Sequence, residues 1–553
     1  ETNVRESLDT LRYDSDGNLV CGLPRAAPGF GFLTPQDCVP VNFFAPSLFT
    51  DKRFATRAEE DFLFGNVINT TEIKQQHYSA LITGDLFEMG AGPAAAALGM
   101  EYRVNSIDSA NDFVRSQGLS ASEAPDVEGD TIGKTWIGDL YGEIELPLLE
   151  TLTLNLSGRY TDTETFGNES TWSAKVLFEP TESLKLRATA GTTFRAPNLR
   201  EQFLAGQAGV IGGTNDPCVV PTTANDGGVY DPTGDSRSQR VIDNCVAQGA
   251  DPFALGLQAN VLIPTQTGGA DMINAETSDS FTAGFVFSQQ FSDEFVFDIG
   301  VTYFDIDIAD TVEELDPVAV ISRCFNDEDN LASPFCDRIT RRGVNASNNT
   351  IAGVDASFVN LGLQTSKGID VNARYGNDFN LFNRSWELLA TLTATNYTEL
   401  KEQIDPDDPV DDRVGEVGFP EWSWIGRLDF ATGNWDVIYR ARFIGEFARD
   451  ADDLTESRNR TNLEACTLLG GPVADTGNGP CVKKHFGDSV LYHDLTANYS
   501  RDDWSVAFGI RNIADEQPPL ITQGEGTSRF NHVVQSGYDL DGRSFFLNLQ
   551  RRF

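Results

Sequence analysis

Polar and apolar residues alternate along most of this 553-residue chain, and this period of two constrains its fold more than any other feature. On residues 152–160 one face of an extended strand carries Leu152, Leu154, Leu156 and Tyr160. The other face carries Thr153, Asn155, Ser157 and Arg159. Residues 183–195 and 503–511 repeat the pattern. About fifteen such segments occur, which predicts an all-β protein built from an antiparallel sheet with two unlike faces.

The lengths of the links between these segments alternate too. Six links are short, at residues 146–151, 179–183, 289–294, 377–383, 432–434 and 500–503. Those between them are mostly long, at about 107–133, 196–275, 310–360, 400–421, 446–488 and 514–540, and the link near Gly167 is the brief exception. Short turns on one rim and long loops on the other are typical of a transmembrane β-barrel, with the turns in the periplasm and the loops outside the cell.

Composition excludes several other classes of protein. The chain has 41 Lys and Arg against 83 Asp and Glu, a formal charge of −42, which would repel nucleic acid. The longest apolar stretch, 89–100, is too short to cross a bilayer as a helix, and the first ten residues lack the pattern of a secretory signal. The sequence contains no hydrolase, zinc-protease or nucleotide-binding motif, so we expect neither an enzyme nor a cofactor.

The cysteines predict disulfides. They fall in neighbouring pairs, at Cys21 and Cys38, Cys218 and Cys245, Cys324 and Cys336, and Cys466 and Cys481. None forms a CxxC, and the four histidines are scattered, so we expect no metal site. When strands are counted back from a periplasmic C-terminus, every pair falls on the outer side. An oxidising compartment fits this arrangement.

The same count predicts how the chain is divided. An odd number of strands would place the two ends of the chain on opposite sides of the membrane, whereas a complete single-chain barrel has an even number. We therefore expect residues 1–70 to be part of an extracellular loop region and residues 71–553 to be the C-terminal part of a larger barrel. A strand in residues 1–13 could instead bring the number of strands to sixteen.

Several phrases resemble the TonB-dependent outer-membrane receptor family. The family motif is matched by Phe194, Arg195, Ala196, Pro197, Asn198 and Leu199, followed by Glu201. Residues 510–519 resemble the family's Asn-Leu-Phe-Asp segment, and the terminal aromatic Phe553 matches its C-terminal assembly signal. Residues 38–44 and 86–103 resemble a proteobacterial branch of these receptors.

This resemblance implies a 22-stranded barrel in the bacterial outer membrane, of which this chain holds fifteen or sixteen strands, and a plug domain that is absent here. It also implies partners: the TonB energy-transducing complex acting through that plug, outer-membrane lipid and a small-molecule ligand, with the receptor a monomer. On the polar face, Lys185, Arg187 and Arg195 are candidates for plug or lumen contacts, or for ion pairs within the barrel wall. Pro197 should end the strand.

Two further sets of residues suggest local roles. Aromatic residues near strand ends predict girdles at the membrane interface: Trp136, Trp172, Trp422, Trp424, Trp435, Trp504 and Tyr492. The acidic run 405–412 could bind Ca²⁺, but its spacing does not match an EF-hand, and a solvated loop explains it as well.

The function expected from this resemblance is active uptake of a scarce ligand, foremost a ferric siderophore. Importers of carbohydrate, cobalamin or a nickel complex share the same frame. From the residues alone, a passive sixteen-stranded porin and a β-rich surface adhesin remain alternatives.

The predicted orientation can be tested with thiol reagents. After reduction, an impermeant reagent applied to intact cells should label loop cysteines such as Cys466, because the long loops lie outside. Labelling should be detected by mass spectrometry of the purified receptor. If these cysteines react only after the outer membrane is ruptured, the orientation is the reverse.

Overall fold

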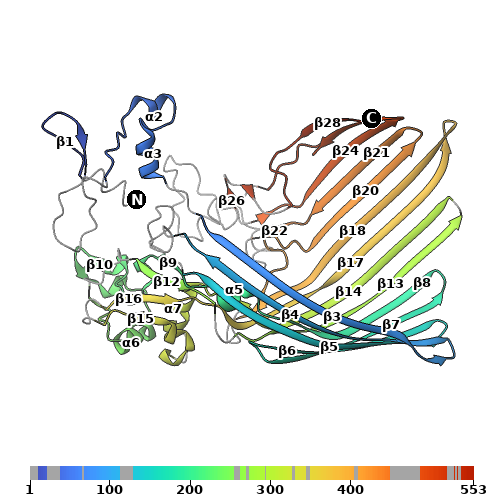
Figure 1. The fold of residues 1–553 in the computed structure, drawn as a ribbon, viewed down its shortest axis with the longest axis horizontal. Coiled ribbons are helices and arrows are strands. Elements are labelled where there is room, and N and C mark those ends of the chain that lie inside the picture. Colours follow the sequence, from blue (N-terminus) through green and yellow to red (C-terminus); the bar gives the residue numbers. More distant parts are fainter. Residues whose placement is uncertain are drawn as a thin grey trace.

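A computed structural model shows a single large, strongly curved antiparallel sheet with folded loops at one end (Figure 1). The structure describes residues 10–21, 38–64, 68–112, 129–254, 262–269, 273–292, 294–326, 330–343, 349–403, 409–448, 486–519, 528–529, 532–533 and 537–552. Within them, fifteen strands follow one another so that almost every neighbour in the sheet is also a neighbour in the sequence. No described helix is long and apolar enough to span a bilayer.

The strands of this sheet are long, as the alternation predicts. In chain order they are β3 (Thr70–Met89), β4 (Gly92–Ala110), β5 (Thr131–Leu149), β6 (Leu152–Thr163), β7 (Asn168–Thr181), β8 (Leu184–Arg195), β13 (Glu276–Ser292), β14 (Phe295–Glu313), β17 (Val359–Leu381), β18 (Arg384–Gln403), β20 (Trp422–Thr432), β21 (Trp435–Ile444), β24 (Val490–Arg501), β25 (Trp504–Arg511) and β28 (Ser544–Arg551). The two-residue strand β19 (Asp411–Asp412) pairs with β18 as a sixteenth member.

One face of the sheet is apolar and is left uncovered. Directly paired residues share a face, and one row of pairs runs through Leu154, Val176, Ala188, Ala283, Tyr303 and Ile369. Side chains on this face remain exposed, for example Leu156 at 39%, Phe281 at 44%, Phe508 at 46% and Leu547 at 72%. No described helix or second sheet packs over it, so this face meets its surroundings directly.

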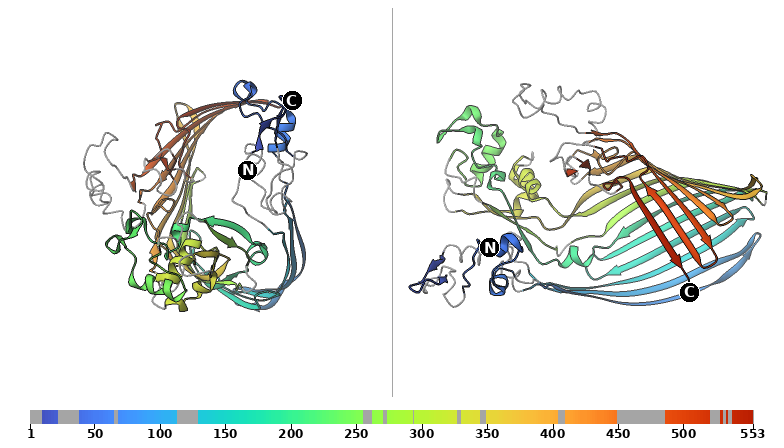
Figure 2. Two further views of the ribbon diagram at one scale, coloured as in Figure 1. Left: turned by 90° about the vertical axis from the view of Figure 1, so that its left-hand side faces the viewer. Right: turned by 90° about the horizontal axis from the view of Figure 1, so that it is seen from above.

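The other face is polar. One row runs through Glu143, Ser157, Ser173, Gly191 and Ser280. The hydroxyls of Ser157 and Ser173 share a hydrogen bond of 2.7 Å. Figure 2 shows that the sheet curves into an open arc when it is viewed along the strands. The alternation leads us to expect the polar face on the inside of this arc. We call it the lumen face.

The two ends of the sheet are β3 and β28, and no described strand joins them. Residues Arg12–Tyr13 (β1) pair with Leu19–Val20 (β2) in a separate small sheet. The rest of the segment considered above for a sixteenth strand, residues 1–9, lies outside the described residues. The short helices α2 (Pro46–Thr50) and α3 (Arg57–Leu63) follow. Strand β3 then begins at Thr70.

Two long loops fold together into a compact unit beside one end of the sheet (Figure 1, lower left). This loop unit comprises the described residues between β8 and β13 and between β14 and β17. Its sheet has the order β15–β16–β12–β9, and the parallel pair of β12 with β16 joins the two loops. The elements from the first loop are α5 (Leu199–Phe203), β9 (Gln207–Ile211), η1 (Gly213–Asn215), η2 (Thr222–Ala224), β10 (Asn225–Asp226), β11 (Val229–Tyr230), η3 (Pro232–Gly234), α6 (Gln239–Ala247) and β12 (Ile263–Thr267). Those from the second are α7 (Pro317–Asn326), η4 (Asn330–Ala332), η5 (Pro334–Arg338), β15 (Ile339–Arg341) and β16 (Ile351–Asp355).

The loop unit holds the main buried apolar core of the described chain. Val320, Phe325 and Ile351 are fully buried, and they pack with residues of the first loop such as Val241 and Ile263. The disulfides Cys218–Cys245 and Cys324–Cys336 each close one of the two loops onto this core. A third disulfide joins Cys21 to Cys38, whereas Cys466 and Cys481 lie outside the described residues. Three further short strand pairings involve β22 (Phe447–Ala448) with β23 (Phe486–Gly487), β26 (Ser528–Arg529) with β27 (His532–Val533), and β10 with β11.

Candidate functional site

The Phe-Arg-Ala-Pro-Asn segment lies at the junction between the sheet and the loop unit. Strand β8 ends at Arg195, and α5 begins after Asn198. The Asn198 side chain accepts hydrogen bonds from the backbone of Arg200 and Glu201, and the Glu201 carboxylate accepts one from the Asn198 backbone at 2.8 Å. This is a capping box, which satisfies backbone donors at the start of a helix. Pro197 lies between strand and helix, where neither requires its missing N–H.

Arg195 ties this junction together through two carboxylates. Its Nε and Nη2 each donate to Glu276 at 2.6 Å, and its Nη1 donates to both oxygens of Glu201 at 3.0 Å. Glu276 begins β13 and also accepts a hydrogen bond from the backbone of Val312, near the end of β14. Bidentate pairs of arginine with carboxylate are among the stronger polar contacts in proteins. One guanidinium therefore fixes the places where both loops leave the sheet.

The other two candidate cations also have partners in the chain. Lys185 pairs with Glu179 at 2.5 Å, and Arg187 donates to the hydroxyl of Thr302 at 2.8 Å. All three cations thus lie on the lumen face with acceptors from neighbouring strands, and Arg195 has a further acceptor on α5. A contact of these residues with a plug stays a prediction. Phe553, the proposed assembly signal, lies outside the described residues.

A second network of charges lies on the lumen face of β4, β5 and β6. Arg159 donates to Asp139 through Nε at 2.9 Å and pairs with it through Nη2 at 2.8 Å. The same Nη2 lies 3.2 Å from Glu101, and the hydroxyl of Thr161 donates to Asp139 at 2.6 Å. One cation from β6 thus pairs with carboxylates from β4 and β5, and a hydroxyl of β6 completes the contacts of Asp139. The alternation predicted the polar face for Arg159, but not its partners.

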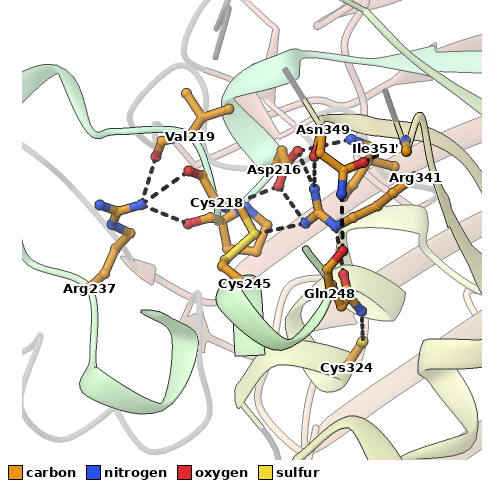
Figure 3. Close-up of polar contacts among 12 residues, drawn as sticks. Asp216, Cys218, Val219, Arg237, Cys245, Gln248, Cys324, Arg341, Asn349 and Ile351 are labelled. Atoms are coloured by element: carbon orange, nitrogen blue, oxygen red, sulfur yellow. Dashed lines mark hydrogen bonds and ion pairs between the residues drawn. A yellow bond between two sulfur atoms is a disulfide. The ribbon is translucent and has the colours of Figure 1, made fainter. Parts of the chain in front are cut away.

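The loop unit is held by a buried ion pair between its two loops (Figure 3). Asp216 accepts from both terminal nitrogens of Arg341, at 2.9 and 3.1 Å, and the two side chains are only 1% and 7% exposed. Asp216 also accepts from the backbone of Ile351 at 2.9 Å. Arg341 completes its contacts with Gln248, with the carbonyl of Asn349 and with the sulfur of Cys218. This pairing spans 125 residues of sequence and was not visible in any motif.

A second arginine of the loop unit binds backbone oxygens. Arg237 donates to the carbonyls of Pro217, Cys218 and Val219, and more closely to that of Pro252 at 2.7 Å. It also pairs with Asp235 at 2.6 Å, and both side chains are buried. The hydrogen bonds from Arg237 hold the pKa of Asp235 at about 2, below its ordinary value. These contacts clamp the segment that carries the Cys218–Cys245 disulfide.

A cavity of about 390 Å³ opens on the lumen face at the loop end of β18, β20 and β21. Its lining includes Tyr397, Glu416, Arg442, Phe447 and Tyr538. The Arg442 guanidinium lies over the Tyr492 ring at 4.7 Å and donates to the carbonyl of Gly537. Burial raises the pKa of Tyr538, so its phenol stays protonated and can donate. The cavity can thus offer a cation, a hydroxyl donor and aromatic faces to a small ligand.

The aromatic residues expected to form girdles divide between the two faces. Trp172, Trp422, Trp435 and Trp504 project from the apolar face and are between 42% and 52% exposed. Tyr492 is different: it pairs with Arg442 across the strands, lies on the lumen face and is 2% exposed. Its neighbours Leu491, His493 and Leu495 occupy the apolar face instead. The expectation for Tyr492 was wrong. Leu491 and Leu495 lie on the apolar face of this strand, so the alternation places Tyr492 on the lumen face.

A family model for the TonB-dependent-receptor-like β-barrel matches residues 10–513. The chain belongs to the TonB-dependent receptor family. Barrels of this family are bacterial outer-membrane proteins and transporters rather than enzymes, which confirms the expected fold class and location. The uncovered apolar face of this TonB-dependent receptor barrel is the kind of surface that outer-membrane barrels turn toward lipid.

Solved structures with the same fold are receptors of this family. The siderophore receptor PirA from Acinetobacter baumannii aligns with a TM-score of 0.50 at 16% identity, covering 88% of this chain and 55% of PirA. The ferric enterobactin receptor PfeA from Pseudomonas aeruginosa aligns at 0.51 and 15% identity, covering 87% and 54%. The chain thus spans about half the length of these structures, and at such identities the likeness shows the fold alone. A search of the curated proteins found no match.

The buried ion pair predicts a specific pattern of stability in this receptor. Asp216→Ala should destabilise the loop unit by about 3–5 kcal/mol, because it leaves the buried Arg341 guanidinium without its carboxylate. Arg341→Met in the same chain should recover part of this loss. Hydrogen exchange of the loop unit, with the strands of the sheet as internal reference, measures both. Equal protection in the single variant and the wild type, or strictly additive losses in the double variant, would contradict the assignment.

The Asp235–Arg237 pair predicts a loss of loop stability in acid. Because the pKa of Asp235 is lower in the folded loop than in the unfolded one, its stabilisation is complete above the ordinary carboxyl pKa of 3.8 and is lost as the pH falls toward about 2. Resistance of residues 217–252 to an acid-active protease should fall across this window. The Asp235→Asn variant should show a flatter profile. Identical profiles would mean that another group controls the acid sensitivity.

Proposed function

We propose that this chain is the C-terminal part of an outer-membrane receptor that takes up a ferric siderophore with energy supplied through TonB. In this proposal the long loops and the loop unit lie outside the cell and the short turns face the periplasm. Residues 1–70 belong to the extracellular loop region and residues 71–553 to the barrel. TonB acts on the plug of the complete receptor, and Lys185, Arg187 and Arg195 are candidates for contact with it.

The observation that carries the proposal is the cavity around Arg442. A ferric siderophore presents oxygen atoms and negative charge, and both suit a guanidinium and a protonated phenol held beside aromatic rings. The rest of the chain is strongly acidic, so a local cation is needed where an anionic chelate is to rest. PirA and PfeA are described as receptors for a siderophore and for ferric enterobactin, and they share the fold of this chain.

The mechanism that we propose is conformational rather than covalent. A ligand held between the cavity and the loop unit favours a closed state, and work done through TonB shifts the receptor to a state that releases it. Uptake therefore needs two states with different affinities for the same ligand. A passive porin needs neither, because solutes cross it without tight binding.

An importer of carbohydrate is the second candidate, and the lining of the same cavity gives the reason. Phe447, Tyr538 and Glu416 offer ring faces and a carboxylate, which also suit a neutral sugar with many hydroxyls. The two candidates differ in their need for Arg442. An anionic chelate depends on the cation, whereas a neutral sugar does not.

Binding to the purified full-length receptor tests this proposal. Ferric enterobactin, a ferric hydroxamate, cyanocobalamin and a maltooligosaccharide should be titrated separately and followed by calorimetry. We expect one of the ferric chelates to bind and Arg442→Ala to weaken that binding by about tenfold or more, a change of about 1.4 kcal/mol for each factor of ten.

Arg440→Ala is the matched control, because Arg440 lies on the same strand and the same face but does not line the cavity. The Kd of this variant should stay within about twofold of the wild-type Kd, well below the tenfold change expected for Arg442→Ala. If only the oligosaccharide binds, the proposed substrate is a sugar and not a ferric siderophore. Equal losses in both variants would mean that overall lumen charge, and not this cavity, decides binding.

A further inference from the structure

The cavity around Arg442 is lined from two directions. Thr393 and Arg442 line it from the sheet, whereas Gly537 and Tyr538 line it from the loop that precedes β28. Residues 537–539, which we call the cover segment, belong to no helix or strand of the described chain. Their place over the cavity therefore depends on individual contacts with side chains of other elements.

Two strand residues that face each other anchor the cover segment. Arg442 on β21 and Tyr492 on β24 are directly paired on the lumen face. The Arg442 guanidinium donates to the carbonyl of Gly537. The Tyr492 hydroxyl accepts a hydrogen bond from the backbone N–H of Asp539 at 3.1 Å. The segment is thus bound at the residue before Tyr538 and at the residue after it.

The backbone of the cover segment fits closely against the strand that carries Arg442. Gly537 has a φ of 108°, in the left-handed region that favours glycine. A Cβ at this position would lie 3.3 Å from Cδ1 of Ile444, the last residue of β21. A larger residue than glycine would therefore meet both an unfavourable backbone conformation and a tight contact.

The Tyr538 ring packs on a buried aromatic residue from another loop. Its centroid lies 6.1 Å from that of Phe447, with the planes inclined by 69°, and Phe447 is 1% exposed. Val417, from a third loop, packs against Phe447 as well. Apolar packing of this kind holds the ring but does not orient its hydroxyl, because the hydrophobic effect has no direction. The directional contacts are the hydrogen bonds of Gly537 and Asp539.

Tyr492 is well placed to orient the segment. Its side chain is 2% exposed, and the Arg442 guanidinium lies over its ring, 4.7 Å from the centroid. In such a buried place a hydrogen bond is electrostatically stronger than in water. Tyr492 is not among the residues that line the cavity, so it can act on a ligand only through the residues that it holds.

We propose that Tyr492 is a positioning residue of this cavity: its hydroxyl holds the cover segment so that the Tyr538 phenol faces a bound ligand. Arg442 has two roles in this arrangement, because it contacts the ligand and also anchors the segment. Tyr492 has the second role alone. The consequence for ligand binding rests on the proposed function, whereas the position of the cover segment can be tested without any ligand.

Tyr492→Phe in the full-length receptor tests the position of the cover segment. The substitution keeps the buried ring beneath Arg442 and removes only the oxygen that accepts from Asp539. We expect the Asp539 amide to exchange with deuterium about fivefold faster than in the wild type, because one hydrogen bond is lost. Mass spectrometry of the peptide that contains Asp539 measures this rate.

The absorbance of the Tyr538 phenolate gives an independent signal. Burial raises the pKa of this phenol, so release of the cover segment in Tyr492→Phe should lower the pKa toward its ordinary value. Each protein should be titrated beside the same protein carrying Tyr538→Phe, and the difference in absorbance isolates this one residue. An unchanged titration of Tyr538 in Tyr492→Phe would contradict the positioning role.

Calorimetry with ferric enterobactin tests the consequence for binding. Tyr492→Phe should raise the Kd about fivefold, although the Arg442 cation is still present. In a receptor that already carries Tyr538→Phe, the same substitution should change the Kd by less than about twofold, because the hydroxyl that Tyr492 positions is gone.

Tyr499→Phe is the matched control, because Tyr499 lies on the same strand but pairs with Trp435 on the apolar face. It should leave the amide exchange and the Kd as in the wild type. Equal exchange of Asp539 in Tyr492→Phe and the wild type would overturn the inference. Additive losses of affinity in the double variant would show that Tyr492 does not act through Tyr538. If ferric enterobactin does not bind the wild type while the exchange responds as expected, the proposed function fails for this chelate and the positioning role stands.

Discussion

The structure depends on the pairing of backbone hydrogen bonds along a sheet whose two faces need different surroundings. In hydrocarbon an unpaired N–H or C=O costs several kcal/mol, so strands can cross a bilayer only where their neighbours complete the ladder. The fifteen described strands pair in sequence order, which completes the ladder everywhere except at β3 and β28. Once the backbone hydrogen bonds are paired, the surroundings of each face determine which side chains it carries. Successive residues point to opposite faces, so the sequence alternates with a period of two.

A sheet of this kind has no dry protein core to stabilise it. Its lumen face carries ion pairs such as Arg159 with Asp139, and no described helix or second sheet covers its apolar face. The buried core has instead been built in the loops, around Phe325 and Val320, where water surrounds the unit and the hydrophobic effect operates as in a soluble domain. Two disulfides and a buried ion pair add to that core because the unit is small.

The sequence predicts the sheet well and the loop unit poorly, for a physical reason. Alternation is a local property, so Leu152 and Arg159 can be assigned to faces without knowledge of any other strand. The pairs Cys218–Cys245 and Cys324–Cys336 are likewise close in sequence. Two other contacts join different loops: Asp216 with Arg341, and the parallel pairing of β12 with β16. Such contacts produce no local pattern in the sequence from which they could be predicted. Asn198 and Glu201 show the same contrast: their capping box has a sequence signature, whereas the bond from Arg195 to Glu276 has none.

That last bond explains how a loop built as a separate unit can still be coupled to the sheet. If the loop unit were attached only through flexible links, its position would not depend on anything in the barrel wall. Arg195 instead joins the end of β8, the start of α5 and the start of β13, and Glu276 extends the link to Val312 near the end of β14. Both loops of the unit depart from these strands, so the guanidinium contacts lie at the base of the loop unit. One arginine and two carboxylates thus connect that base to three strands of the sheet, β8, β13 and β14.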